Sequence, residues 1–168
     1  MDWFQKIEAA ESLPLDDPEL EILFNDPEYR VRYILVKRLP GEHPAMGGFA
    51  SDESSYLRSL AAQKLPVESP AFDKLCKDED PHVRLICAYR VPLDSPLISE
   101  FMEDWHIRAN ARNDILQRAL IARHPVREMF PRSEIKELYD CLKQYWHSFL
   151  PQQKESWQTI FRELGFGG

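Results

Sequence analysis

Residues 52–66 read DESSYLRSLAAQKLP, and residues 78–92 read DEDPHVRLICAYRVP. Both stretches begin with Asp-Glu, carry an arginine at their seventh position and end in an apolar residue followed by proline. Each position lies 26 residues from its counterpart. A repeat of fixed period is the first feature to seek in a chain, because it determines the architecture.

The period of 26 residues extends over the first hundred residues in five columns. They are Leu13, Leu39, Leu65 and Val91, each followed by proline; Pro18, Pro44, Pro70 and Pro96; Asp26, Asp52, Asp78 and Asp104; Leu23, Phe49, Leu75 and Phe101; and Arg32, Arg58 and Arg84. Five columns in register indicate four successive copies of one unit. A fifth copy follows, displaced by seven residues, with a helix expected over Asp114–His124 before Pro125.

Each column has a physical role in a helical unit. The aspartate caps a helix by accepting backbone N–H bonds, and the apolar residue with its proline stops that helix. Positions 31, 34 and 35 and their counterparts form one apolar helical face. Small residues at position 36 and its counterparts let neighbouring helices approach closely. About a dozen residues separate one helix from the next, which is room for a short helix or a 3₁₀ turn.

The frame Pro-x7-Asp-x4-Val-Arg, seen over Pro18–Arg32, resembles the core signature of HEAT repeats. The short unit resembles more closely the leucine-rich-repeat variant (LRV) family, whose D-x-x-x-x-V-R-x-x-x-A pattern is met over Asp78–Ala88. The resemblance implies an all-α protein, a right-handed α-solenoid of about five short HEAT-like or LRV-like repeats. Some LRV members carry an iron–sulfur module with clustered cysteines. This chain has no such cluster, so no cofactor is expected.

The repeats are expected to cover residues 1–130 of a single domain, 1–168. Terminal repeats need a cap over their exposed core face. Two helices fit that role, one from Ser133 to about Phe149 and one over about 152–164, each with an aromatic apolar stripe.

Composition and cysteine usage favour a cytoplasmic protein. The three cysteines, Cys76, Cys87 and Cys141, are widely spaced, so neither a disulfide framework nor a metal knuckle is indicated. The first residues lack the basic and apolar regions of a signal peptide, and no apolar run reaches the roughly 20 residues of a membrane span. The five histidines are scattered, and no nucleophile motif or phosphate loop is present, so we expect neither a metal site nor an enzyme. Cys87 is expected in the core.

Two basic columns have structural interpretations. Arg32, Arg58 and Arg84 are expected to reach the capping aspartate of a neighbouring unit and form a ladder, with ligand binding as the alternative. Arg38, Lys64, Arg90 and Arg123 stand just before each proline, where a base favours the helix dipole and lies near the last carbonyls.

The candidate binding surface is the flank formed by positions 30, 33 and 37. It reads Arg30, Tyr33 and Lys37, then Tyr56, Ser59 and Gln63, then His82, Leu85 and Tyr89. These positions vary between units while the core columns keep their type, which suits either a binding surface or plain solvated surface. The segment that breaks the repeat extends the candidate surface by Trp105, Arg108 and Arg112, because insertions often carry function, with a spacer that has no role as the alternative.

Charge is unevenly placed along the chain. Net charge is −7, and residues 1–28 alone hold nine acids and one base, for −8. Residues 105–132 hold six arginines, at 108, 112, 118, 123, 127 and 132, against two acids. We therefore predict a non-enzymatic protein–protein interaction module with a basic partner, in one form an inhibitor or immunity-type protein. The alternative is a nucleic-acid-binding HEAT-like protein that uses the arginine-rich segment, although acidic net charge disfavours it.

Overall fold

The computed structural model describes residues 1–166, and all regular structure in that range is helical. It comprises eleven α-helices and two 3₁₀ helices, with no strand among these residues. The prediction of an all-α protein is therefore confirmed. The chain divides into two compact units, Met1–Arg90 (unit 1) and the residues from Val91 onward (unit 2). The single domain with a cap from residue 131 stays a prediction.

Unit 1 is built on four long helices: α1 (Trp3–Ser12), α3 (Tyr29–Arg38), α5 (Ser55–Lys64) and α7 (Pro81–Arg90). Helices α3 and α5 end where the sequence predicts, with Leu39 and Leu65 as C-caps before proline. The N–H groups of these two leucines donate to the carbonyls of Leu35 and Ala61 at 2.9 Å. Proline has no N–H to continue the ladder, so the helix stops.

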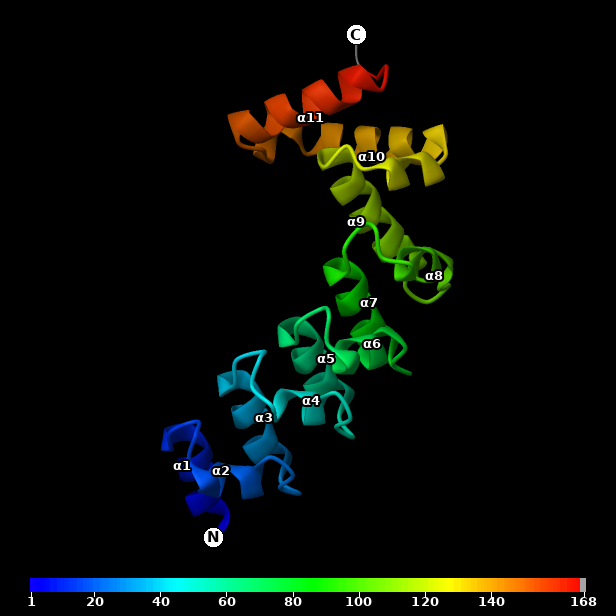
Figure 1. Ribbon diagram of the computed structural model, residues 1–168. Coiled ribbons are helices and arrows are strands. Elements are labelled where there is room, and N and C mark those ends of the chain that lie inside the picture. Colours follow the sequence, from blue (N-terminus) through cyan, green and yellow to red (C-terminus); the bar gives the residue numbers. More distant parts are fainter. Residues whose placement is uncertain (167–168) are drawn as a thin grey trace. The chain divides into compact units, whose positions relative to one another are not determined.

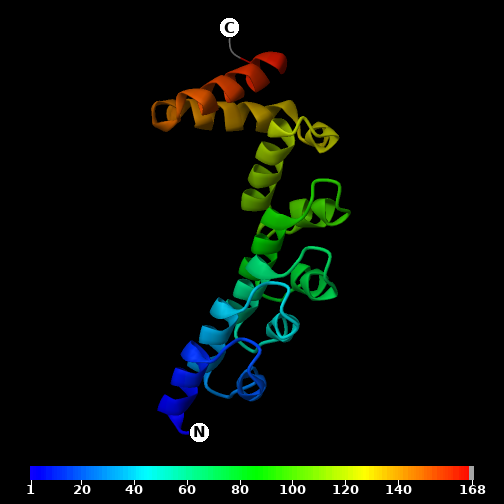
Figure 2. The same cartoon turned by 60° about the vertical axis from the view of Figure 1, so that its left-hand side comes forward.

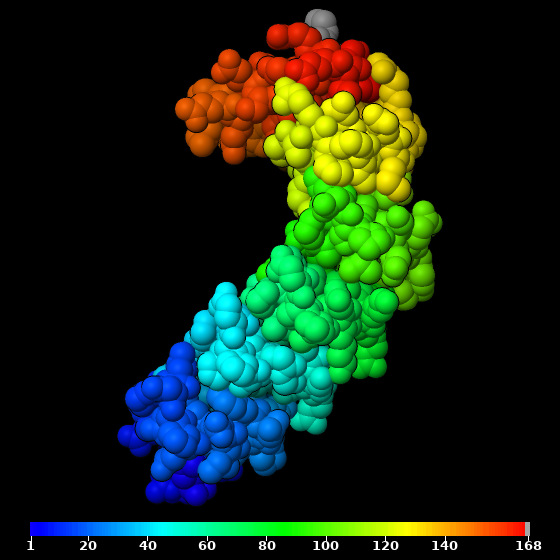
Figure 3. Space-filling model, in the orientation of Figure 1, coloured from blue at the N-terminus to red at the C-terminus, as the bar shows by residue number. Residues whose placement is uncertain are grey.

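The long helices pack in chain order, α1 on α3, α3 on α5 and α5 on α7. Three short helices lie between them along the chain: α2 (Pro18–Leu23), α4 (Met46–Phe49) and α6 (Pro70–Cys76). Figures 1 and 2 show the short helices on one side of the row of long helices. In the space-filling view of Figure 3, unit 1 is a series of colour bands in sequence order, because each segment packs on its sequence neighbours.

Proline and polar caps explain where short helices begin. Pro18 and Pro70 occupy the first turns of α2 and α6, where their missing N–H costs nothing. Asp17 accepts the N–H of Glu19, and Ser69 accepts that of Phe72. The second proline column therefore marks the start of a short helix in these two copies.

The core of unit 1 consists of the predicted apolar columns. Val31, Leu57 and Val83 are fully buried, as are their partners four residues on, Leu35, Ala61 and Cys87. Val36, Ala62 and Ala88, at the small-residue position, are also fully buried. Position 34 is less enclosed in two units, where Ile34 and Ile86 are half-buried, whereas its counterpart Leu60 is buried. The helical face thus centres on positions 31 and 35.

Unit 2 contains α8 (Leu97–Glu103), α9 (Arg108–Ile121), the 3₁₀ helix η1 (Pro125–Met129), α10 (Arg132–Gln144), η2 (Trp146–Ser148) and α11 (Pro151–Glu163). Helix α9 packs on α8, η1 and α11. Figures 1 and 2 both show α11 lying alongside α10.

Three predicted boundaries in unit 2 were wrong. Helix α9 begins at Arg108 instead of Asp114, because the Arg108 N–H already donates to the Asp104 carbonyl at 2.7 Å. It ends at Ile121 instead of His124, because Arg123 takes a left-handed conformation with φ 51°. Helix α10 ends at Gln144, and a 3₁₀ turn replaces the expected helix up to Phe149.

No helix in residues 1–166 combines the length and the apolar character that crossing a membrane requires.

Candidate interaction surface

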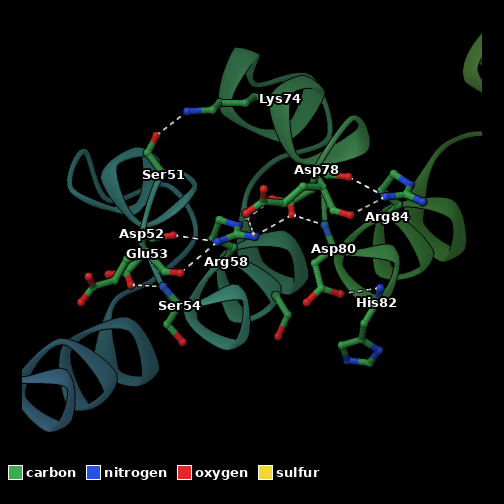
Figure 4. A network of polar contacts seen from close by, with 12 residues as sticks. Ser51, Asp52, Glu53, Ser54, Arg58, Lys74, Asp78, Asp80, His82 and Arg84 are labelled. Atoms are coloured by element: carbon green, nitrogen blue, oxygen red, sulfur yellow. Dashed lines mark hydrogen bonds and ion pairs between the residues drawn. The ribbon is translucent and has the colours of Figure 1, made fainter.

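The first arginine column of unit 1 forms an ion-pair ladder with the aspartate column (Figure 4). Arg32 donates from Nε and Nη2 to the two carboxylate oxygens of Asp52, at 2.8 and 3.1 Å. Arg58 repeats this one unit further on, reaching Asp78 at 2.7 and 2.9 Å. The predicted reach to the aspartate of the next unit is confirmed for both pairs. These two arginines are therefore structural, and their pKa values are raised by the hydrogen bonds to Asp52 and Asp78.

Each ladder arginine also binds the loop of its own unit. Nη1 of Arg32 donates to the Asp26 carbonyl at 2.8 Å, that of Arg58 to Asp52 at 3.0 Å and that of Arg84 to Asp78 at 2.6 Å. The Asp26, Asp52 and Asp78 carboxylates accept the N–H two residues on, at 2.9 Å. One guanidinium thus ties the start of its own helix to the start of the next.

Lys6 occupies the arginine column in the first unit, a role that the sequence reasoning missed. It stands 26 residues before Arg32, and its Nζ lies 2.7 Å from Asp26 Oδ2. Burial alone would raise the pKa of Asp26, but the bonds from Lys6 and the Glu28 N–H hold it below the ordinary value of 3.8. The spacing of 26 residues between Lys6 and Arg32 is the signal that would have identified Lys6 as a member of this column.

The second basic column binds the helix that precedes its own. Lys64 Nζ donates to the carbonyls of Val36, Lys37 and Leu39, at 2.9, 2.6 and 2.8 Å. Arg38 binds Ala10 and Leu13 in the same way, and Arg90 binds Ala62. These bases satisfy carbonyls at a helix end, as expected, but the carbonyls belong to the preceding long helix.

Arg123 was wrongly placed in this column. It is half exposed and binds Glu163 at 3.2 and 3.0 Å. Arg118 makes the helix-end contact in its place, donating from Nη1 to the Val91 carbonyl at 2.8 Å. The earlier start and end of α9 explain the change, because they shift which residue occupies the last full turn.

The candidate surface of unit 1 is mostly exposed, with one correction. Six of its predicted residues are exposed: Arg30, Lys37, Tyr56, Gln63, His82 and Tyr89. Position 33 faces inward more than expected, since Tyr33 and Leu85 are half-buried and Ser59 is 1% exposed. Ser59 lies between packed helices and donates to the Tyr56 carbonyl at 2.7 Å, so it does not belong to the surface.

Three tyrosines form a row across two adjacent long helices. Tyr33 of α3 stacks on Tyr29, with ring centroids 6.2 Å apart, and on Tyr56 of α5, with centroids 6.0 Å apart. The interplanar angles are 18° and 24°. Tyr29 and Tyr56 are 40% and 50% exposed, so the row presents ring surface to solvent. We call Tyr29, Tyr33 and Tyr56 the tyrosine row.

Tyr29 and two aromatic residues of α1 were not among the predicted surface residues. Burial, with smaller effects from Tyr56 and Tyr33, raises the pKa of Tyr29. Phe4 is 76% exposed and contacts Trp3 edge-on at 4.8 Å. Phe4 lies one period before Arg30, and Trp3 one period before Tyr29. Extending the columns back to the first unit would have found them.

The predicted residues of the 105–112 segment belong to unit 2 and differ in their surroundings. Trp105 is 71% exposed, with its ring 3.7 Å from that of His106, and Arg108 is exposed. Arg112 donates to Glu134 at 2.7 and 3.3 Å and lies over the Phe130 ring at 5.2 Å. Arg112 therefore stabilises the contact between α9 and α10.

The arginine-rich segment is largely engaged within unit 2. Arg118 binds Asp114 at 2.6 Å, Arg112 binds Glu134 and Arg123 binds Glu163. Arg132 lies over the Phe166 ring at 4.5 Å. Four of the six guanidiniums of this segment therefore contact other groups of the same chain.

Within the described residues, no group of His, Cys, Asp and Glu is placed to hold a metal ion. Cys87 is fully buried, as predicted, and its hydrogen bond with Cys76 together with burial raises the pKa of its thiol far above the ordinary value. A thiol in that state is a poor nucleophile.

Comparison with protein-family models, with curated proteins and with solved structures found no match to this chain. The resemblance to HEAT-like and LRV repeats therefore rests on the repeated columns.

Proposed function

We propose that this protein is a non-enzymatic protein-binding module, a right-handed α-solenoid of HEAT-like repeats that binds its partner on the long helices of unit 1. The observation that carries the proposal is the tyrosine row, which is stacked, partly exposed and spans two adjacent helices. Stacking holds these rings before a partner arrives, so little side-chain freedom remains to be lost on binding. Tyrosine is also enriched at the centres of protein interfaces.

Exposed charged and polar residues on the same two helices as the tyrosine row would set its specificity. Arg30 and Lys37 on α3 and Gln63 on α5 are exposed. Polar rims around an aromatic centre are typical of protein interfaces. Tyr89 on α7, 43% exposed, extends the aromatic character one unit further.

The solenoid arrangement is supported by the recurrence of the same contacts at intervals of 26 residues. The ladder pairs Arg32–Asp52 and Arg58–Asp78 both span 20 residues, and the helix-end contacts of Arg38 and Lys64 both reach back 25 residues to a leucine carbonyl. A repeat array requires the same contacts between each unit and the next.

Affinity capture with a matched control tests the binding face. The protein, Tyr29→Asp/Tyr56→Asp and Ile22→Asp would each serve as bait in nuclease-treated lysate. Ile22 is 71% exposed on α2 of the same unit, so its change adds a charge to an exposed apolar residue away from the row. The proposal predicts a protein partner held by the wild type and by Ile22→Asp but lost from the tyrosine variant. Loss from both variants, or from neither, would contradict it.

An inhibitor or immunity-type role is one form of this proposal, and the acidic start of the chain supports it. Exposed Glu8, Glu11, Asp16, Glu19 and Glu21 lie on α1, α2 and their connection. Long-range attraction by such a surface speeds association with a basic partner and weakens with salt. Neutralising these five acids to Gln or Asn should lower the association rate at low salt and leave the rate at high salt unchanged.

Nucleic-acid binding is the alternative, and nuclease treatment of the lysate distinguishes it from protein binding. In a second capture from untreated lysate, a partner that is held only without nuclease would favour the exposed Arg108 in unit 2.

A further inference from the structure

A hollow of about 480 Å³ in unit 2 has the features of a second binding site. Its walls are aromatic: Tyr139 from α10, Trp146 from η2, Phe161 from α11 and Phe166 just after α11. The volume lies within the range of about 300–1,000 Å³ that is usual for ligand sites. None of these residues belongs to the binding face proposed on unit 1.

The rings of the aromatic wall pack against one another. Tyr139 meets Phe161 edge-on at 4.9 Å and stacks with Phe166 at 6.0 Å, while Phe161 and Phe166 are 6.4 Å apart and nearly perpendicular. Phe161 is 1% exposed and forms the floor, whereas Tyr139, Trp146 and Phe166 are half-buried. A ring that enters the hollow therefore meets fixed ring faces and edges.

The charged groups that line this hollow are both cations. Lys143 and Arg162 belong to its lining, and no carboxylate does. Lys143 Nζ lies over the Tyr139 ring, 5.6 Å from its centroid. The acids next in sequence to Tyr139 and Arg162 bind other bases: Asp140 binds Lys136 at 2.5 Å, and Glu163 binds Arg123 at 3.0 Å. The hollow thus selects for a negative charge close to an apolar group.

We propose that this hollow binds an acidic peptide segment of a partner protein, which inserts one aromatic side chain among Tyr139, Trp146 and Phe166 and pairs neighbouring carboxylates with Lys143 and Arg162. An aromatic anchor in a preformed pocket with charged groups at its rim is a common way to recognise a peptide. A nucleic-acid strand fits less well, because it needs a basic track along several nucleotides. Residues 91–168 carry ten bases and eleven acids, a net charge of −1.

The test uses a fluorescein-labelled peptide, Glu-Asp-Phe-Glu-Glu-Gly, titrated with the full chain and followed by fluorescence anisotropy. Two control peptides replace Phe by Ala, or all the acids by their amides. The proposal predicts saturable binding of the first peptide and at least about fivefold weaker binding of each control peptide. No saturation up to about 1 mM protein, or equal binding of the three peptides, would overturn it.

Matched protein variants locate the site. Lys143→Gln should weaken binding about fivefold, the size expected for one charge-assisted contact, whereas Arg108→Gln, at an exposed position on α9, should leave it unchanged. Trp146→Leu should weaken binding with little change in the thermal unfolding midpoint, because Trp146 is half-buried. Equal effects of Lys143→Gln and Arg108→Gln would overturn the site. A labelled single-stranded oligonucleotide that binds more tightly than the peptide, and is released by Trp146→Leu, would overturn the choice of ligand.

Discussion

Arg58 donates from Nε and Nη2 to both carboxylate oxygens of Asp78, one unit further along the chain, at 2.7 and 2.9 Å. The side chains of both residues are less than a tenth exposed. The same guanidinium binds the Asp52 carbonyl of its own unit at 3.0 Å. A planar fork can bridge two units in this way, which a lysine ammonium cannot reproduce.

Removing this arginine should destabilise unit 1. Arg58→Ala leaves the buried Asp78 carboxylate without its main partner, so we expect the free energy of unfolding to fall by about 3 kcal/mol. Arg30→Ala, on an exposed face of α3, should change it by less than about 0.5 kcal/mol. Urea unfolding followed by circular dichroism measures both. Similar losses in the two variants would mean that the ladder contributes little.

Close packing at Gly41 predicts a second pair of effects. A Cβ added at Gly41 would lie 2.0 Å from the Lys64 carbonyl oxygen, so the backbone of α5 would have to move. Gly41→Ala should cost about 2 kcal/mol or more of unfolding free energy.

Gly48→Ala is the control for this steric argument. Nothing lies within 4 Å of a Cβ at Gly48, which belongs to the short helix α4. This change should be neutral or stabilise the protein by up to about 1 kcal/mol. If the thermal midpoints of the two alanine variants agreed, the close approach of the Gly41 loop to α5 would be wrong.

Acid should weaken unit 1 through Asp26. Its pKa in the folded protein is below 3.8, so ionised Asp26 stabilises the fold at higher pH, and this stability is lost as pH falls below about 4. The unfolding free energy between pH 6 and pH 2.5, measured in urea, should therefore decline less steeply in Asp26→Asn than in wild type. Asp16→Asn, at an exposed position, should keep the wild-type slope. A parallel decline in all three proteins would rule out Asp26 as a source of the acid sensitivity.

Thiol reactivity should distinguish the three cysteines. Cys141 is exposed, whereas Cys76 and Cys87 are buried. Hydrogen bonding and burial hold the Cys87 thiol protonated, which slows its reaction further. An aromatic disulfide reagent at pH 8 should label one thiol rapidly in the native protein and three in urea. Rapid labelling of two or more thiols without denaturant would contradict the burial of this pair.

Much of unit 1 was predictable because its period repeats the same local physics. The apolar residue with its proline ends α3 and α5 as expected, and the aspartate and arginine columns meet as expected at Arg32–Asp52 and Arg58–Asp78. Where the period breaks, prediction failed. Asp104 precedes α9 as the other aspartates precede their helices, and its carboxylate accepts the His106 N–H at 3.1 Å. The prediction placed the extra residues before the helix, whereas they lie within it, since α9 has 14 residues and α3, α5 and α7 have 10 each.

The candidate surface was harder to predict than the core. Ser59 occupies a surface column but is 1% exposed, whereas Tyr33 in the same column is half-buried. The stacking of Tyr29, Tyr33 and Tyr56 depends on how two helices lie against each other, which column spacing alone does not specify. The helix-end contacts of Arg38 and Lys64 likewise join different units. The sequence alone does not show that each base binds the preceding long helix instead of its own.

The most direct test of the central claim places a photo-crosslinking benzoylphenylalanine at position 56, within the tyrosine row, and separately at position 22 on α2. Both proteins would be irradiated in nuclease-treated lysate and their adducts identified by mass spectrometry. The account predicts a protein adduct from position 56 that is absent from position 22. Equal crosslinking from both positions, or none from position 56, would contradict a protein-binding face on the long helices of unit 1.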